Sequence, residues 1–109
     1  MTTITITKSS DDKFKRIDVE GHAGFADAGK DIVCAAISAM TINLINSIEK
    51  FTDDWFAGNA DSDKGIITLE LSEDPSNEVD LLCKSYELGV TSISKQYGKK
   101  FLNIKFRRE

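Results

Sequence analysis

Between Asp31 and Phe51 the sequence contains neither glycine nor proline, and apolar residues recur there every three or four positions. This spacing predicts an α-helix with one apolar side, which must be buried against another apolar surface. Asp31 is the expected N-cap, because its carboxylate can accept a hydrogen bond from a free N–H group of the first turn. The apolar side is predicted to consist of Val33, Ile37, Met40, Leu44, Ile48 and Phe51.

Short stretches of alternating apolar residues predict the strands that cover this helix. Ile4 and Ile6 alternate with threonines, and a second apolar stretch follows the polar residues 9–12, so the chain is expected to begin with a β-hairpin. Two further strands are predicted, at Ile66–Leu71 and at residues 101–106. Residues 52–65 are predicted to form a loop that can include a short edge strand at residues 55–59.

A second helix is predicted between the last two strands. Asp74 and Pro75 are expected to be its N-cap and its first residue, because the first turn of a helix does not need the N–H that proline lacks. Gly98 is well placed to end it, and Gly89 inside it costs about 1 kcal/mol relative to alanine. Its apolar side is predicted to consist of Val79, Leu82, Cys83, Tyr86, Val90, Ile93 and Tyr97.

The predicted order is strand, strand, helix, one or two strands, helix, strand, with no repeated strand–helix–strand unit. We therefore expect an α+β fold in which two helices pack on a mainly antiparallel sheet. The 109 residues are expected to form one domain, residues 1–109. A chain of this length can bury enough apolar surface to fold without a metal or a disulfide. Two cysteines 49 positions apart and one histidine do not suit a zinc site, so neither metal nor cofactor is expected.

The charge balance bears on the partners of the protein. Lys and Arg number 14 against 18 Asp and Glu, a net charge of −4, so no direct binding of nucleic acid is expected. The longest apolar run, residues 32–37, is far shorter than the roughly 20 residues that cross a bilayer, and the N-terminal residues do not resemble a secretory signal. A cytoplasmic protein without a membrane segment is expected. A solvated basic edge strand is predicted from Lys99, Lys100, Lys105, Arg107 and Arg108.

The segment from Gly21 to Cys34 carries the predicted chemistry. It places the only histidine, His22, at the end of a strand and Cys34 in the first turn of the long helix. The positive end of a helix dipole favours a thiolate over a thiol, and free N–H groups there can bind an oxyanion. A nearby imidazole can take the thiol proton and later protonate a leaving amine. The pattern therefore favours a cysteine nucleophile that attacks an acyl carbon.

The cysteines and the nearby serine also have simpler structural interpretations. Cysteine is among the most buried residue types, so Cys34 can equally be a structural thiol. Cys83 lies in the apolar side of the second helix and is expected to be part of the core. Ser38, one helical turn after Cys34, either faces the same pocket or is simply exposed.

Two further pairs of residues are left with open alternatives. Asp27 and Asp31 are both near enough in sequence to orient His22, but Asp31 is already accounted for as the N-cap, so a dyad is favoured over a triad. Trp55 and Phe56, in a polar stretch, either form a surface for a substrate or partner or pack into the core.

Two motifs and their spacing carry a resemblance to a known family. Eleven residues separate His22 from Cys34, and the motifs are Gly21-His22-Ala23 and Gly29-Lys30-Asp31-Ile32-Val33-Cys34-Ala35-Ala36, followed by Ser38. This segment resembles the signature of the Prp family of ribosomal-processing cysteine proteases. The length of the chain, the hairpin at its start and the order of the two helices are also similar to that family.

The resemblance implies a small bacterial cysteine endopeptidase that acts as a homodimer. Its substrate would be the N-terminal extension of a large-subunit ribosomal protein, cut just after two aromatic residues. The resemblance places the nucleophile on Cys34 and the general base on His22, with Asp31 and Ser38 as supporting residues. The loop that would contact the substrate includes Ala23, Gly24, Phe25 and Gly29.

A competing hypothesis comes from a different class of protein. The chain would be a non-enzymatic, ribosome-associated binding domain in which Cys34 is a buried structural thiol. Thiol reactivity separates the two hypotheses, because an activated Cys34 should be alkylated much faster than Cys83 and a structural one should not.

Overall fold

The two N-terminal stretches of alternating residues pair as the predicted hairpin, β1 (Thr2–Lys8) with β2 (Phe14–Gly21), in the computed structural model of the chain. The structure describes residues 1–21, 28–61 and 64–109, and for residues 28–31 the backbone alone. The other elements in this part of the chain are α1 (Ala28–Phe51), β3 (Phe56–Asp61), β4 (Ile66–Leu71), α2 (Asn77–Tyr97) and β5 (Leu102–Arg108).

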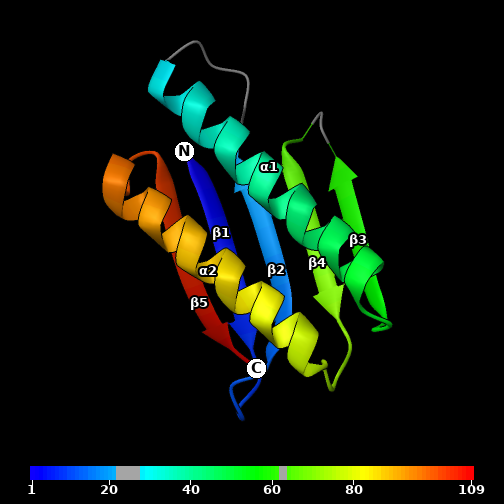
Figure 1. Cartoon of the computed structure of the whole chain (residues 1–109). Coiled ribbons are helices and arrows are strands. Elements are labelled where there is room, and N and C mark those ends of the chain that lie inside the picture. The colour runs from blue at the N-terminus through cyan, green and yellow to red at the C-terminus, as the bar shows by residue number, and fades with distance from the viewer. Residues whose placement is uncertain (22–27, 62–63) are drawn as a thin grey trace.

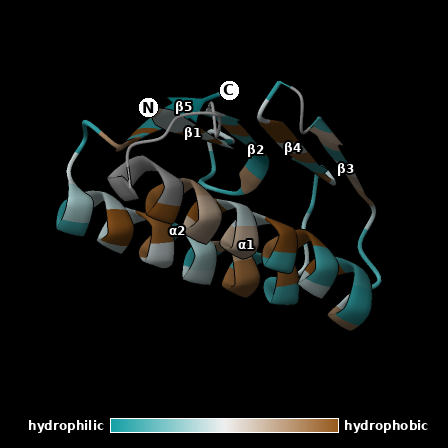
Figure 2. Ribbon diagram, turned by 90° about the horizontal axis from the view of Figure 1, so that it is seen from above, coloured by the Kyte–Doolittle hydropathy of each residue, from teal (hydrophilic) through white to brown (hydrophobic). Residues whose placement is uncertain are grey.

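The strands of the described residues form one sheet in the order β3-β4-β2-β1-β5. All neighbouring strands are antiparallel except β1 and β5, which are parallel. Figures 1 and 2 show that both helices cover the same face of this sheet and run in opposite directions. The predicted α+β class is confirmed. The short strand expected after the first helix is β3, at one edge. Of the predicted basic edge strand, Lys105, Arg107 and Arg108 belong to β5 at the other edge, whereas Lys99 and Lys100 lie in the turn before it.

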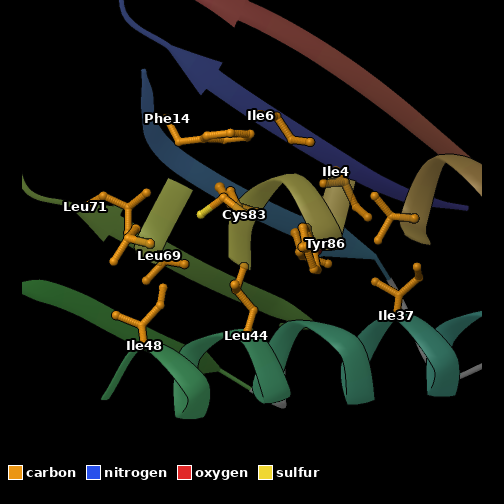
Figure 3. Packing of buried hydrophobic residues seen from close by; sticks show 14 of the residues in the cluster. Ile4, Ile6, Phe14, Ile37, Leu44, Ile48, Leu69, Leu71, Cys83 and Tyr86 are labelled. Atoms are coloured by element: carbon orange, nitrogen blue, oxygen red, sulfur yellow. The ribbon is translucent and has the colours of Figure 1, made fainter. Parts of the chain in front are cut away.

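The apolar sides of the two helices meet the sheet in a single core (Figure 3). On α1 the predicted positions Val33, Ile37, Leu44 and Ile48 are buried, and on α2 the buried positions are Val79, Cys83, Tyr86 and Val90. The predicted apolar side of each helix is wrong at its C-terminal end. Phe51 and Tyr97, each the last residue of its helix, are 71% and 39% exposed. Periodicity predicts an apolar side along the whole helix, but it does not show where the core that covers this side ends.

The predicted N-terminus of the first helix is wrong. α1 begins at Ala28, so Asp31 is its fourth residue and not its N-cap, and Cys34 is its seventh. Residues 28–30 are Ala-Gly-Lys, of which alanine and lysine are favourable in helices. Gly29 costs about 1 kcal/mol, but without a proline in this stretch the helix still extends almost one turn before the aspartate.

The predicted start of the second helix is also wrong. Ser76, not Asp74, is the N-cap of α2, and its Oγ accepts a hydrogen bond of 3.2 Å from the backbone N–H of Val79. Pro75 therefore precedes the cap, and the Asp74 carboxylate pairs instead with Lys13. A serine caps a helix as well as an aspartate does, so composition could not choose between the two residues.

Glycine is required at two positions, one at the end of α2 and one inside it. Gly98 ends the helix, as predicted, with a φ of 99° that side chains rarely adopt and an N–H that donates to the Ser94 carbonyl at 2.8 Å. Gly89 faces α1, where a Cβ would collide with the end of the Met40 side chain. The cost of a helical glycine is therefore offset by closer packing of the two helices.

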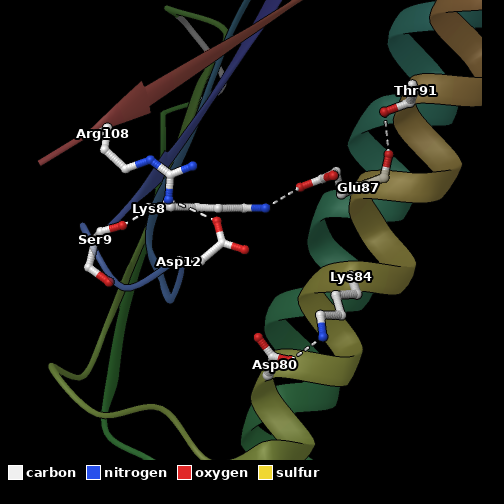
Figure 4. A network of polar contacts seen from close by, with 8 residues as sticks. All are labelled: Lys8, Ser9, Asp12, Asp80, Lys84, Glu87, Thr91 and Arg108. Atoms are coloured by element: carbon white, nitrogen blue, oxygen red, sulfur yellow. Dashed lines mark hydrogen bonds and ion pairs between the residues drawn. The ribbon is translucent and has the colours of Figure 1, made fainter.

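Ion pairs gather at the end of the sheet where β1 meets its turn (Figure 4). Arg108 lies 2.8 Å from the Asp12 carboxylate, and Lys8 lies 3.2 Å from Glu87 on α2. The Arg108–Asp12 pair is exposed, and exposed pairs contribute little to stability, whereas the Lys8–Glu87 pair is partly buried. Lys8 is about 20 Å along β1 from Thr2, so this polar end is well separated from the opposite end of the strand.

The segment Ile32–Phe51 has the length and apolar composition of a membrane-crossing helix. The core helix of a globular domain meets the same criterion, and in α1 the buried side chains of this segment pack into the core.

Candidate active site

A cavity of about 300 Å³ lies where β1 begins and β2 ends. Its walls come from these two strands, from α1 between Cys34 and Ile42, and from the β3–β4 hairpin. Most of its lining side chains are apolar, and the complete lining is Thr2, Val19, Gly21, Cys34, Ile37, Ser38, Ile42, Ala60, Asp61, Gly65, Ile66 and Ile67. This volume is at the lower end of the range of small-molecule pockets and is sufficient for a single large side chain.

The two cysteines have opposite environments. Cys34 is half-buried in the wall of the cavity, with its Sγ 3.3 Å from the Oγ1 of Thr2. Cys83 is completely buried in the core, as predicted, and burial raises the pKa of its thiol to about 12. Cys34 is therefore the thiol that a molecule in the cavity can reach.

Ser38 lies one helical turn after Cys34 and lines the same cavity. Its side chain is exposed, whereas Ile37 beside it is buried and forms an apolar part of the wall. The structure therefore brings two of the candidate residues, Cys34 and Ser38, to one surface.

The expected position of Cys34 in the first turn of the helix is wrong. As the seventh residue of α1, it lies about 9 Å along the axis from the start of the helix. The free N–H groups of a helix belong to its first four residues, and the dipole effect falls off within the first turn. Helix-start chemistry therefore does not account for an activated sulfur at this position, and the described polar group next to it is the Thr2 hydroxyl.

Several of the candidate residues lie outside the described part of the chain. Gly29 and Asp31 are described by their backbone only, both within α1. Gly21, which directly precedes the candidate histidine in the sequence, lines the cavity. The residues outside the described ranges are His22, Ala23, Gly24, Phe25 and Asp27.

Sequence reasoning missed Thr2. It is only 4% exposed and pairs across the hairpin with Gly21. A Cβ on Gly21 would lie 2.6 Å from Thr2 Oγ1 and 2.8 Å from Thr2 Cα, so this close approach requires glycine. The alternation of threonine with isoleucine shows that Thr2 shares a face with Ile4, but it does not show which helix residue covers that face.

The aromatic pair after α1 has two different environments. Phe56 is partly buried and packs against the core, whereas Trp55 is 58% exposed. Trp55 lines a separate polar groove together with Arg16, Glu70 and Arg107. Neither residue belongs to the lining of the cavity beside Cys34. No three metal-ligating side chains come together within the described residues.

The fold thus places a half-buried thiol beside an apolar cavity that can hold a side chain of a bound molecule. The family model of the cysteine protease Prp matches residues 1–102, and the chain belongs to this family. The resemblance inferred from the segment around Cys34, and the enzyme class that it implied, are confirmed.

The chain is similar to several members of this family. It is 27% identical over 106 residues to the ribosomal processing cysteine protease Prp of Staphylococcus aureus, an alignment that covers 96% of this chain and 100% of that protein. The Prp of Bacillus subtilis is 36% identical over 44 residues, 40% of this chain and 39% of that protein.

Solved structures show the same fold. The crystal structure of SMU.848 from Streptococcus mutans superposes with a TM-score of 0.89 and 28% identity, covering 100% of this chain and 96% of that chain. The crystal structure of the S. aureus ribosomal processing protease Prp with a substrate peptide has a TM-score of 0.87 and 25% identity, covering 100% of both chains.

Proposed function

We propose that this chain is an endopeptidase that removes the N-terminal extension of a large-subunit ribosomal protein by cutting after two adjacent aromatic residues. The observation that carries the proposal is the position of Cys34, half-buried in the wall of an apolar cavity, in a chain of the Prp family. The similar S. aureus protein is a ribosomal processing protease that binds a substrate peptide, which supports the same class of substrate here.

In the proposed reaction Cys34 is the nucleophile and His22 is the general base. His22 takes the thiol proton, and the Cys34 thiolate forms a bond to the carbonyl carbon of the scissile peptide. As the tetrahedral intermediate collapses, the imidazolium gives the proton to the leaving amine, and a thioester remains on the sulfur. Water, deprotonated by the same imidazole, then hydrolyses the thioester and restores the thiol.

Two observations support this pair of residues. Cys34 and Gly21 both line the cavity, and His22 is the residue that follows Gly21 in the sequence. Asp31 and Ser38 remain the proposed supporting residues. Since α1 begins before Asp31, this aspartate is not needed as an N-cap, and the earlier reason for preferring a dyad over a triad no longer holds.

The apolar cavity supports the proposed preference for aromatic residues. Val19, Ile42, Ile66 and Ile67 line the cavity that Cys34 also lines, so a large apolar side chain of the substrate can be buried next to the sulfur. A small residue after the cleavage site lets the scissile bond approach the helix. The proposal also includes contacts from the loop residues Ala23, Gly24, Phe25 and Gly29.

The proposal also includes a homodimer in the bacterial cytoplasm. Leu81 and Leu88 on α2 support association of two copies, because they lie two turns apart on one side of the helix and are 68% and 71% exposed. The net charge of −4 also favours encounter with a basic ribosomal substrate.

The proposal predicts cleavage of a peptide that contains two phenylalanines followed by alanine and a lysine-rich stretch. The reduced protein should cut it after the second phenylalanine, and Cys34→Ala should lower kcat/KM by at least about 10³-fold, because it removes the nucleophile. Products are located by mass spectrometry, and a scrambled peptide is the control for sequence preference.

Cys83→Ala is the matched control, since it also removes one thiol but from the core. It should retain cleavage if it folds. Full cleavage by a folded Cys34→Ala variant would overturn the assignment of the nucleophile, and cleavage of the scrambled peptide at the same rate would overturn the proposed specificity.

A further inference from the structure

Thr2 has a polar side chain in a position where the sheet usually buries an apolar one. It lies on the core face of β1 together with Ile4 and Ile6, and it is only 4% exposed. Its Oγ1 lies 3.3 Å from the Sγ of Cys34, and within the described residues no other group bonds to this hydroxyl. A buried hydroxyl is costly unless it is hydrogen-bonded, so the contact with the sulfur satisfies it.

The backbone around Thr2 fixes the position of this hydroxyl. β1 lies between two other strands, and Thr2 pairs with Gly21 on β2 and with Leu102 on β5. Its N–H donates to the Phe101 carbonyl at 3.1 Å. The missing side chain of Gly21 leaves the space that the Thr2 hydroxyl and Cα occupy. The hydroxyl is therefore held by the sheet rather than by a loop, so it is preorganised toward the sulfur.

We propose that Thr2 is a positioning residue for Cys34. Its hydroxyl donates a hydrogen bond to the thiolate and holds the sulfur at the wall of the cavity. The inference rests on the proposed function in one respect, the role of Cys34 as nucleophile. Hydrogen bonds to a charged acceptor are stronger than those to a neutral one, so the contact favours the thiolate over the thiol. In the thiol form the same hydroxyl can accept a hydrogen bond from the S–H group, because a hydroxyl both donates and accepts.

The position of Cys34 along α1 explains why such a contact is needed. The sulfur is too far from the start of the helix to gain from its free N–H groups. A hydroxyl fixed in the sheet supplies at this position the polar contact that a cysteine in a first turn would receive from the helix itself.

The test compares Thr2→Val with Thr2→Ser. Valine has nearly the same shape and favours strands, but it cannot donate a hydrogen bond, whereas serine keeps the hydroxyl. The rate of Cys34 alkylation by iodoacetamide is measured against pH, by mass spectrometry of the peptide that contains Cys34, together with kcat/KM on the diphenylalanine peptide.

Thr2→Val is expected to move the midpoint of the alkylation profile to higher pH and to lower kcat/KM by about 10-fold. Thr2→Ser is expected to restore most of both values. Thr7→Val is the matched control, because Thr7 is a buried threonine of the same strand, 3% exposed and about 17 Å from Thr2. It should leave both values unchanged.

The outcomes separate this inference from the proposed function. An unchanged alkylation profile in Thr2→Val, in an enzyme that cleaves the peptide, would overturn the role of Thr2. If the wild-type protein cleaves no peptide but Thr2→Val still shifts the alkylation profile relative to the wild type, the proposed function is overturned and the contact with the sulfur stays in place. If Thr2→Val does not fold, as judged by its urea unfolding curve, Thr2→Ala must show the same shift of the profile, and an unshifted profile would overturn the inference.

Discussion

The same side chain, a cysteine thiol, occurs in two regions of this molecule with opposite properties. Cys34 lies on α1 beside a cavity of about 300 Å³ and is half-buried. Cys83 lies on α2 in the middle of the core (Figure 3), and burial raises the pKa of its thiol to about 12. Both cysteines lie on helices, so what covers each thiol, and not the type of element that carries it, makes their environments different.

The arrangement of the two helices explains the difference. Both pack on the same face of the sheet, but the N-terminal part of α1 lies over the end at which β1 begins and β2 stops (Figure 1). There the β3–β4 hairpin and α1 form the walls of a cavity instead of closing on each other. Cys83 has Phe14 and Leu69 among the neighbours of its buried cluster and has no such opening.

Alkylation of the native protein at pH 8 is the strongest test of the difference between the two thiols. A thiol with a pKa of about 12, against an ordinary value of 9.0, has roughly 10³-fold less thiolate at this pH, and burial slows the reagent further. Cys83 should therefore react at least about 10³-fold more slowly than an ordinary exposed thiol, and Cys34, which borders the cavity, should be the thiol that is modified. Quantification of the two peptides by mass spectrometry gives the ratio.

Urea provides the control for this ratio. In the unfolded chain both thiols are exposed and should react at similar rates, because the difference comes from the fold. If Cys34 and Cys83 are alkylated at similar rates in the native protein, the fold does not protect Cys83 more than Cys34.

The stability of the two alanine variants is a second test of the difference between the two cysteines. Cys83→Ala truncates a completely buried side chain and should lower the free energy of unfolding by about 1 to 2 kcal/mol. Cys34→Ala should lower it less, because the side chain already borders a cavity and its removal creates little new void. Urea unfolding curves of both variants measure the difference, and a larger loss for Cys34→Ala would contradict the assignment of Cys83 to the core.

Sequence reasoning located most of the fold because its evidence is local. Alternation around Ile4 and Ile6 predicted the hairpin, and the spacing of Val33, Ile37 and Leu44 predicted the buried side of the first helix. The starts of both helices were placed wrongly, since several nearby residues can cap a helix and only the packed structure selects one of them.

The surroundings of the candidate site were harder to predict. Cys34 and Ser38 share a helix face, so their common surface follows from the period of the helix. Thr2 meets Cys34 across 32 positions of the sequence, and Gly21 leaves room for Thr2 through the pairing of two strands. Such contacts depend on how the helix lies over the sheet, which no local pattern specifies.

The smallest expected effect is the dependence of stability on alkaline pH. Cys83 is neutral in the folded protein up to a pKa of about 12, whereas its ordinary pKa is 9.0. Above pH 9 the unfolded chain has therefore lost a proton that the folded chain retains, so the free energy of unfolding falls as pH rises from this value toward 12. Between pH 8 and 9.5 this thiol should cost the wild type about 1 kcal/mol, a loss that Cys83→Ala cannot show. Urea unfolding of both proteins at the two pH values isolates this contribution, because the other titrating groups are common to both. A gap between the two stabilities that stays constant with pH would mean that the Cys83 thiol is not held neutral by burial, and the contrast with Cys34 would then rest on access alone.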